Sequence, residues 1–113
     1  MGTPRPIAAE ALREHFVSVY RLTDEQAAKM IKSAAKSIHN AFELGDQALG
    51  DGDLEMLSRF GHNLKGLFMN MGQPEWAEVA RSVEQLAKAN QLDEIHEQMQ
   101  TLKEAVEHLP DAA

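Results

Sequence analysis

A histidine, a lysine and a glycine stand close together near the middle of the chain, as His62, Lys65 and Gly66 in the stretch GHNLKGLFMNMG. A neutral imidazole is a competent nucleophile near pH 7, because the reference pKa of histidine is about 6.5. A lysine three residues later lies one helical turn away, where its cation would stabilise an anion attached to the ring. This spacing predicts a histidine that accepts a phosphoryl group, with Lys65 offsetting the charge on its oxygens.

Gly66 and two further residues define the surroundings that we expect for the histidine. A glycine within a helix lowers helix stability by about 1 kcal/mol relative to alanine, so we expect the glycine at this position to serve a purpose. Gly66 lies about 40° from His62 around a helix, where the missing side chain leaves the imidazole open to a large partner. Arg59 and Met69 lie on the same outward strip. We expect both of them to contact a docked protein.

The elements that carry these residues are predicted to be helices. Alanine, leucine, glutamate, glutamine, lysine and methionine dominate the sequence and favour helix, and no alternating pattern typical of strands is present. We expect a short N-terminal helix over about residues 6–20 and four longer helices within about 24–109. Short connections make neighbouring helices antiparallel. The predicted fold of residues 1–113 is therefore one all-α domain, an antiparallel up-and-down four-helix bundle with an additional N-terminal helix.

Helix ends and core-facing rows can be placed from single residues. Thr23 and Gln26 have the spacing of a capping box, and Asp53 can cap the third helix. The breaks and the final stop are expected at LGDGD, Gly72 with Pro74, Asn90 and Pro110. The rows expected to face the core include Met30 and Ile31 in the second helix, Leu54, Leu57, Gly61, Leu64, Phe68 and Met71 in the third, and Trp76, Ala80 and Val83 in the fourth.

Glu84 is predicted to lie beside the histidine. His62 precedes Gln73, the centre of the turn, by eleven residues, and Glu84 follows it by eleven, so an antiparallel hairpin puts both at one height. A carboxylate there could accept the ring N–H and leave the other ring nitrogen as the nucleophile. Ser82 lies at the opposite edge of the same helix face, and the sequence leaves open which edge meets the histidine.

These residues resemble a known family. The segment HNLKG at 62–66, followed by Gly72, resembles the H-x-x-K-G-x-x-x-x-x-G signature of histidine phosphotransfer (HPt) domains, and the segments GDGDLEMLSRF and VEQLAKA are similar to their surroundings in the family. The resemblance covers about residues 25–108. One departure is Leu67 and Phe68, where many members have small residues. It bears on the shape of the docking surface and on the partner more than on the phosphorylation site.

The resemblance implies a relay carrier that has no ATP site of its own. It would take a phosphoryl group from an aspartate of one receiver domain and pass it to another, with His62 phosphorylated, Lys65 stabilising the phosphate and Gly66 providing clearance. Glu84 falls where the family often has a polar residue hydrogen-bonded to the histidine. The implied partners are response-regulator receiver domains and a hybrid sensor histidine kinase. No cofactor is implied for this chain, because the Mg²⁺ of the reaction belongs to the receiver.

Other functions have weaker support. A non-catalytic helical docking module is the first alternative, and the phosphate-carrying N-terminal domain of a chemotaxis-type kinase is the second. The net charge of −7 argues against nucleic-acid binding, and no apolar run is long enough to insert in a membrane. A bundle metal site needs paired Glu-x-x-His motifs, and the nearest match, Asp93-x-x-His96, occurs once, so we expect no metal. The absence of cysteine fits a cytoplasmic protein or a piece of a larger one.

Overall fold

Five helices make up the regular structure of the residues that the structure describes. The computed structural model describes residues 3–109. Within that range it contains no strand, and its helices are α1 (Ala9–Tyr20), α2 (Asp24–Asp51), α3 (Leu54–Asn70), α4 (Pro74–Lys88) and α5 (Leu92–Glu104). The all-helical prediction is confirmed.

The predicted caps account for where α2 and α3 begin. The Thr23 hydroxyl accepts the Gln26 amide at 3.1 Å, and the Gln26 side chain accepts the Thr23 amide at 3.0 Å, which completes the capping box. The Asp53 carboxylate accepts the Met56 amide at 3.1 Å. The turns after α2 and α3 each contain a left-handed glycine, since Gly52 has φ 66° and Gly72 has φ 71°.

The two ends of the helical region differ from the prediction. The first helix starts at Ala9 rather than near residue 6, because residues 3–8 are bound in a non-helical strap by more distant parts of the chain. Ile7 is 2% exposed and its amide donates to the Ala105 carbonyl at 2.8 Å, while the Trp76 indole donates to the Arg5 carbonyl at 2.8 Å. The fifth helix ends at Glu104 and is followed by turns. The stop expected at Pro110 lies outside the described residues.

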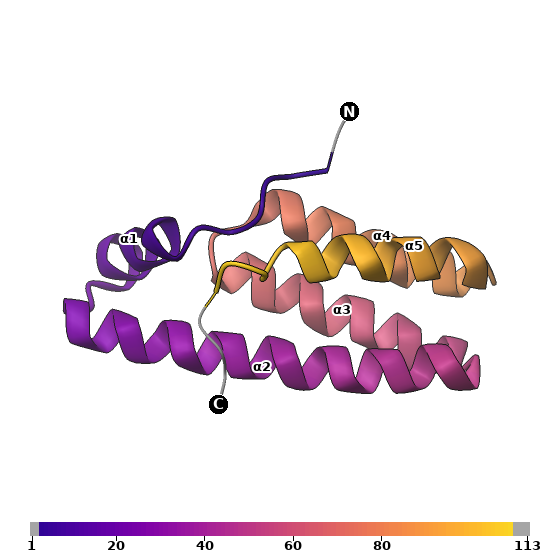
Figure 1. The fold of residues 1–113 in the computed structure, drawn as a ribbon. Coiled ribbons are helices and arrows are strands. Elements are labelled where there is room, and N and C mark those ends of the chain that lie inside the picture. Colours follow the sequence, from indigo (N-terminus) through magenta and orange to yellow (C-terminus); the bar gives the residue numbers. More distant parts are fainter. Residues whose placement is uncertain (1–2, 110–113) are drawn as a thin grey trace.

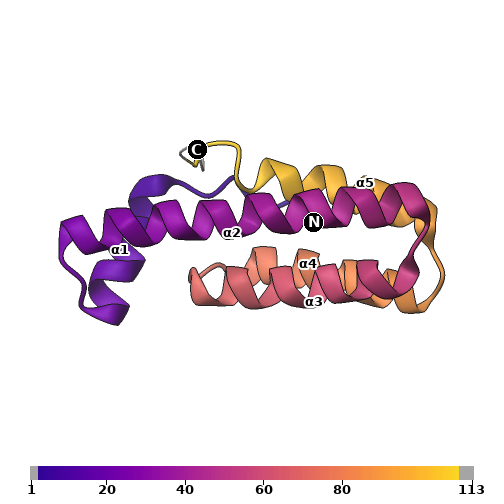
Figure 2. The same ribbon diagram turned by 90° about the horizontal axis from the view of Figure 1, so that it is seen from below.

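The four longer helices lie side by side along a molecule that is 44 Å in its longest dimension (Figures 1 and 2). Helix α3 packs between α2 and α4, and α5 contacts both α4 and α2, so the contacts close into a ring. The short helix α1 packs against α2 at the end of the molecule where α2 begins (Figure 1). This arrangement leaves one side of α3 uncovered.

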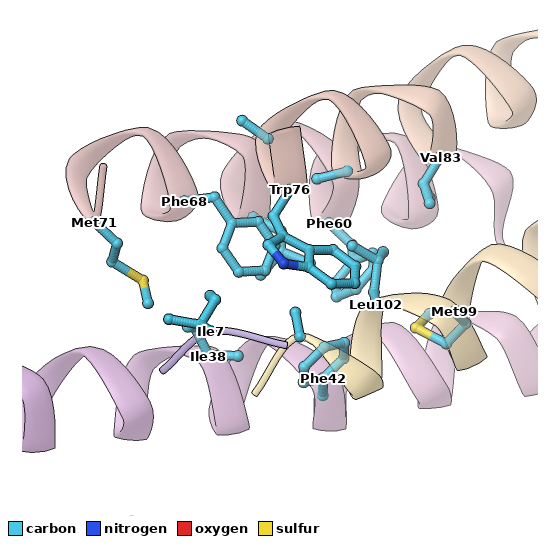
Figure 3. Packing of buried hydrophobic residues seen from close by; sticks show 14 of the residues in the cluster. Ile7, Ile38, Phe42, Phe60, Phe68, Met71, Trp76, Val83, Met99 and Leu102 are labelled. Atoms are coloured by element: carbon cyan, nitrogen blue, oxygen red, sulfur yellow. The ribbon is translucent and has the colours of Figure 1, made fainter. Parts of the chain in front are cut away.

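Aromatic side chains fill the space between the helices (Figure 3). The rings of Phe68 and Trp76 lie 6.2 Å apart, and those of Phe42 and Phe60 lie 5.9 Å apart. Phe60 was not in the predicted core row. It is buried because Gly45 of α2 leaves room for its ring: a Cβ on Gly45 would come within 2.7 Å of it. The prediction for Met30 is wrong, since its side chain is 43% exposed.

Candidate functional site

His62 lies on the outer face of α3. The opposite face is anchored in the core by side chains with no exposed surface, namely Leu57, Leu64 and Phe68. These residues recur at helical spacing, so they rotate the histidine toward solvent. The His62 side chain is 63% exposed. The imidazole is therefore held on a rigid helix and is open to another protein.

Glu84 of α4 is the side chain that faces this imidazole across the helix pair. Its oxygen Oε2 lies 3.4 Å from Nδ1 of His62, and the Glu84 side chain is only 17% exposed. Ser82, at the other edge of α4, is turned away and donates its hydroxyl to the Val79 carbonyl at 2.6 Å. Of the two edges of α4, the one that carries Glu84 therefore faces the histidine. Nε2 of the ring is left on the side away from the carboxylate.

Two lysines surround the same carboxylate. Nζ of Lys65, on α3, lies 3.8 Å from Oε1 of Glu84, and Nζ of Lys88, on α4, lies 3.8 Å from Oε2. The Lys65 side chain is 32% exposed, whereas that of Lys88 is 68% exposed. Sequence reasoning missed Lys88. Its position four residues after Glu84, which is the favourable spacing for a glutamate–lysine pair on a helix, is the signal that could have found it.

The remaining predicted site residues take different positions. A Cβ added to Gly66 would meet no neighbouring atom within 4 Å, so this position is open. Met69 is 58% exposed. Arg59 pairs with Glu55 on its own helix at 3.2 Å, and no ion pair joins it to the carboxylate of Glu84 among the described residues. The structure therefore groups Lys65 with His62 and Glu84 and sets Arg59 apart from them.

An open groove of about 630 Å³ runs between α2 and α3 beside the histidine. Its α3 wall includes His62 and Gly66, and its α2 wall includes Asn40 and Leu44. Among the described residues, the lining contains no lysine, arginine, aspartate or glutamate. Leu44 is 58% exposed and also lines a smaller neighbouring pocket with Met56. Sequence reasoning missed Leu44, although a leucine off the core row of α2 was a usable signal.

Two other kinds of site are absent from the described residues. Across residues 3–109, no group of three or more histidine, cysteine, aspartate or glutamate side chains is arranged to hold a metal ion. No helix in this part of the chain combines the length and the apolar character needed to cross a membrane. The cluster of His62, Glu84, Lys65 and Lys88 is the candidate functional site.

Comparison with known proteins gives one match. A protein-family model described as "Hpt domain" matches residues 10–112 of the chain. This range takes in α2, α3, α4 and α5 and all but the first residue of α1. No curated protein and no solved structure matches the chain.

Proposed function

The chain belongs to the Hpt domain family, and on that premise we propose that it accepts a phosphoryl group on His62 from a receiver-domain aspartate and passes it to another receiver. The observation that carries this proposal is the cluster of an exposed imidazole, a largely buried glutamate whose carboxylate lies 3.4 Å from Nδ1 of the ring, and a lysine 3.8 Å from the same carboxylate. Family membership implies phosphotransfer in two-component signalling. The residue and the direction of transfer are our proposal.

The transfer step uses Nε2 of His62 as the nucleophile. Its lone pair attacks the phosphorus of an aspartyl phosphate, and the N–P bond forms as the bond from phosphorus to the aspartate oxygen breaks. The electron pair of the broken bond leaves with the aspartate as a carboxylate. The ring keeps its Nδ1 proton and becomes a cation facing Glu84. The reverse sequence delivers the phosphoryl group to the aspartate of a second receiver.

Glu84 and Lys65 each stabilise a different charge that develops in this step. The Glu84 carboxylate, 3.4 Å from Nδ1, attracts the Nδ1 proton, which favours the tautomer protonated there and stabilises the ring cation that forms. Lys65 neutralises the phosphoryl oxygens in the transition state and in the phosphorylated protein. Its partial exposure of 32% supports this role, because the ammonium can leave Glu84 without unpacking the helix.

The receiver docks over the groove between α2 and α3. Its uncharged lining and the 58% exposure of Leu44 and Met69 support an apolar contact around the histidine. Gly66 provides clearance for the approach, and Arg59 contributes a cation at the edge of the surface. The Mg²⁺ of the reaction would be supplied by the receiver. Because donor and acceptor use one surface, their binding is mutually exclusive.

The architecture and location that go with this function are also proposals. We propose that α2–α5 form an antiparallel up-and-down bundle, with α1 as a short addition, in a single domain over residues 1–113. The ring of helix contacts and the connections of two or three residues support that arrangement. A cytoplasmic location fits the absence of cysteine. A hybrid sensor histidine kinase that carries a receiver is a candidate donor.

The test is phosphoryl transfer from a panel of phosphorylated receiver domains with Mg²⁺. We expect label on the chain that is labile to acid and stable to base, as a phosphohistidine is, and no label on the His62→Gln variant. His39→Gln is the matched control, because His39 is 65% exposed and pairs with Glu43 at 3.2 Å on another helix. Full labelling of His62→Gln would refute the proposal. Receiver binding without any label would favour the non-catalytic docking module.

A further inference from the structure

Glu84 has more positively charged neighbours than the transfer step described above uses. Its side chain is 17% exposed, and its carboxylate lies within 4 Å of the His62 ring, of Lys65 and of Lys88. Removing a carboxylate from water is costly unless cations or hydrogen-bond donors replace the water. The two lysines and the ring are thus the groups that hold Glu84 between α3 and α4. Lys88 takes no part in the transfer step itself.

The two lysines are not equivalent. Lys65 stands on α3, one turn beyond His62, and contacts Oε1 of Glu84. Lys88 stands on α4, one turn beyond Glu84 itself, and contacts Oε2, the oxygen that also faces Nδ1 of the ring. Lys65 can therefore move to a group attached to the ring, whereas Lys88 shares a helix with the carboxylate and stays with it.

We propose that Lys88 is a positioning residue that holds the Glu84 carboxylate against Nδ1 of His62 while Lys65 moves to the phosphoryl oxygens. This inference rests on the proposed function. It assigns the two cations to two successive tasks: in the resting protein they share one carboxylate, and in the phosphorylated protein Lys65 binds the phosphoryl group while Lys88 alone remains with Glu84.

The physical need for Lys88 arises from charge. A phosphoryl group on Nε2 brings about two negative charges to the ring that Glu84 contacts, and like charges at short range repel. Without Lys88, either Lys65 remains on Glu84 and the phosphoryl oxygens lose their cation, or Glu84 turns toward water and Nδ1 loses its acceptor. Both alternatives slow transfer. They also change the ring, because the tautomer depends on the acceptor at Nδ1.

The experiment compares Lys88→Met with Lys88→Arg and with Lys29→Met. Lys29 is the matched control, since it also pairs with a glutamate four residues earlier, Glu25, at 4.0 Å. This pair lies near the start of α2, outside the site. Two readouts are measured on the full chain. One is the rate of transfer from a phosphorylated receiver. The other is the fraction of His62 protonated at Nδ1 when the ring is neutral, by nitrogen-15 NMR of the unphosphorylated protein.

We expect Lys88→Met to transfer about two- to fivefold more slowly, the range expected for loss of an exposed ion pair, and to lower the Nδ1–H fraction of His62. Lys88→Arg should restore both readouts and Lys29→Met should change neither. The proposal would be overturned if Lys88→Met kept both the wild-type transfer rate and the wild-type tautomer. It would also be overturned by slow transfer with an unchanged tautomer, because Lys88 would then act by contacting the partner protein. If the wild-type protein takes no label, the proposed function is wrong. The Nδ1–H fraction of Lys88→Met compared with wild type still shows whether Lys88 holds Glu84.

Discussion

Gly61 and Glu84 meet backbone to backbone between α3 and α4. A Cβ built on Gly61 would come within 2.7 Å of the Glu84 amide nitrogen and within 2.8 Å of the Ala80 carbonyl oxygen, both of which are main-chain atoms. Gly61 directly precedes His62. The close approach that brings the Glu84 carboxylate to the imidazole therefore depends on the absence of a side chain at the neighbouring position.

We predict that Gly61→Ala destabilises the protein and slows transfer. Alanine normally favours a helix over glycine, but here the helices must separate to admit the Cβ, at a cost of about 1–3 kcal/mol. Separation would also draw Glu84 away from His62. Urea unfolding and the transfer rate measure the two effects. Gly50→Ala is the control, because a Cβ there meets nothing within 4 Å and should raise stability by up to about 1 kcal/mol. A stable, fully active Gly61→Ala would contradict this account.

Counting residues from the turn was sufficient to predict that Glu84 and His62 share one height, but it did not identify the edge of α4 that faces the ring. That edge depends on how α3 and α4 rotate against each other, which the contact at Gly61 sets and the sequence alone does not state. The helix caps were predictable because Thr23 and Asp53 each accept a hydrogen bond from an amide only three residues later in the chain. The non-helical strap that contains Ile7 was not predictable, because the Ile7 amide bonds to Ala105, which is distant in the sequence.

Lys65 should contribute to transfer and little to the fold. We predict that Lys65→Met slows transfer roughly tenfold to a hundredfold, because a cation on the phosphoryl oxygens is lost. Its free energy of unfolding should change by less than about 1 kcal/mol. Lys103→Met is a matched control: Lys103 is 39% exposed and bridges to Asp46 on another helix at 2.9 Å. Equal transfer by Lys65→Met and wild type would remove Lys65 from the mechanism.

The empty position at Gly66 should matter for partners and not for folding. We predict that Gly66→Gln slows transfer about tenfold or more, because its side chain fills the groove beside the imidazole. It should raise stability by up to about 1 kcal/mol, as glutamine favours helix over glycine. Gly66→Ala should give an intermediate rate. Transfer rates and thermal unfolding of this series are the measurement, and three equal rates would show that clearance is not the role of Gly66.

Leu44 offers a test of the docking surface that leaves the histidine cluster intact. We predict that Leu44→Asp weakens binding of the receiver about tenfold, because a carboxylate then enters an uncharged, partly apolar groove. Folding should be unaffected, since Leu44 is 58% exposed. Val19→Asp is the control, with the same 58% exposure on α1 outside the groove lining. Titration of the receiver measures both variants, and unchanged affinity in Leu44→Asp would place docking elsewhere.

The openness of the histidine determines what kind of carrier this protein can be. The His62 side chain is 63% exposed and Gly66 beside it adds no side chain, so a phosphoryl group carried there, as we propose, is open to water as well as to a partner protein. If His62 carries the phosphoryl group as we propose, the lifetime of that group depends on the chemistry of the N–P bond and on the charges near it, and not on a closed cavity around it. On the proposed function, any receiver that fits the groove can collect the phosphoryl group, so the direction of the signal depends on which receivers are present and how well they fit.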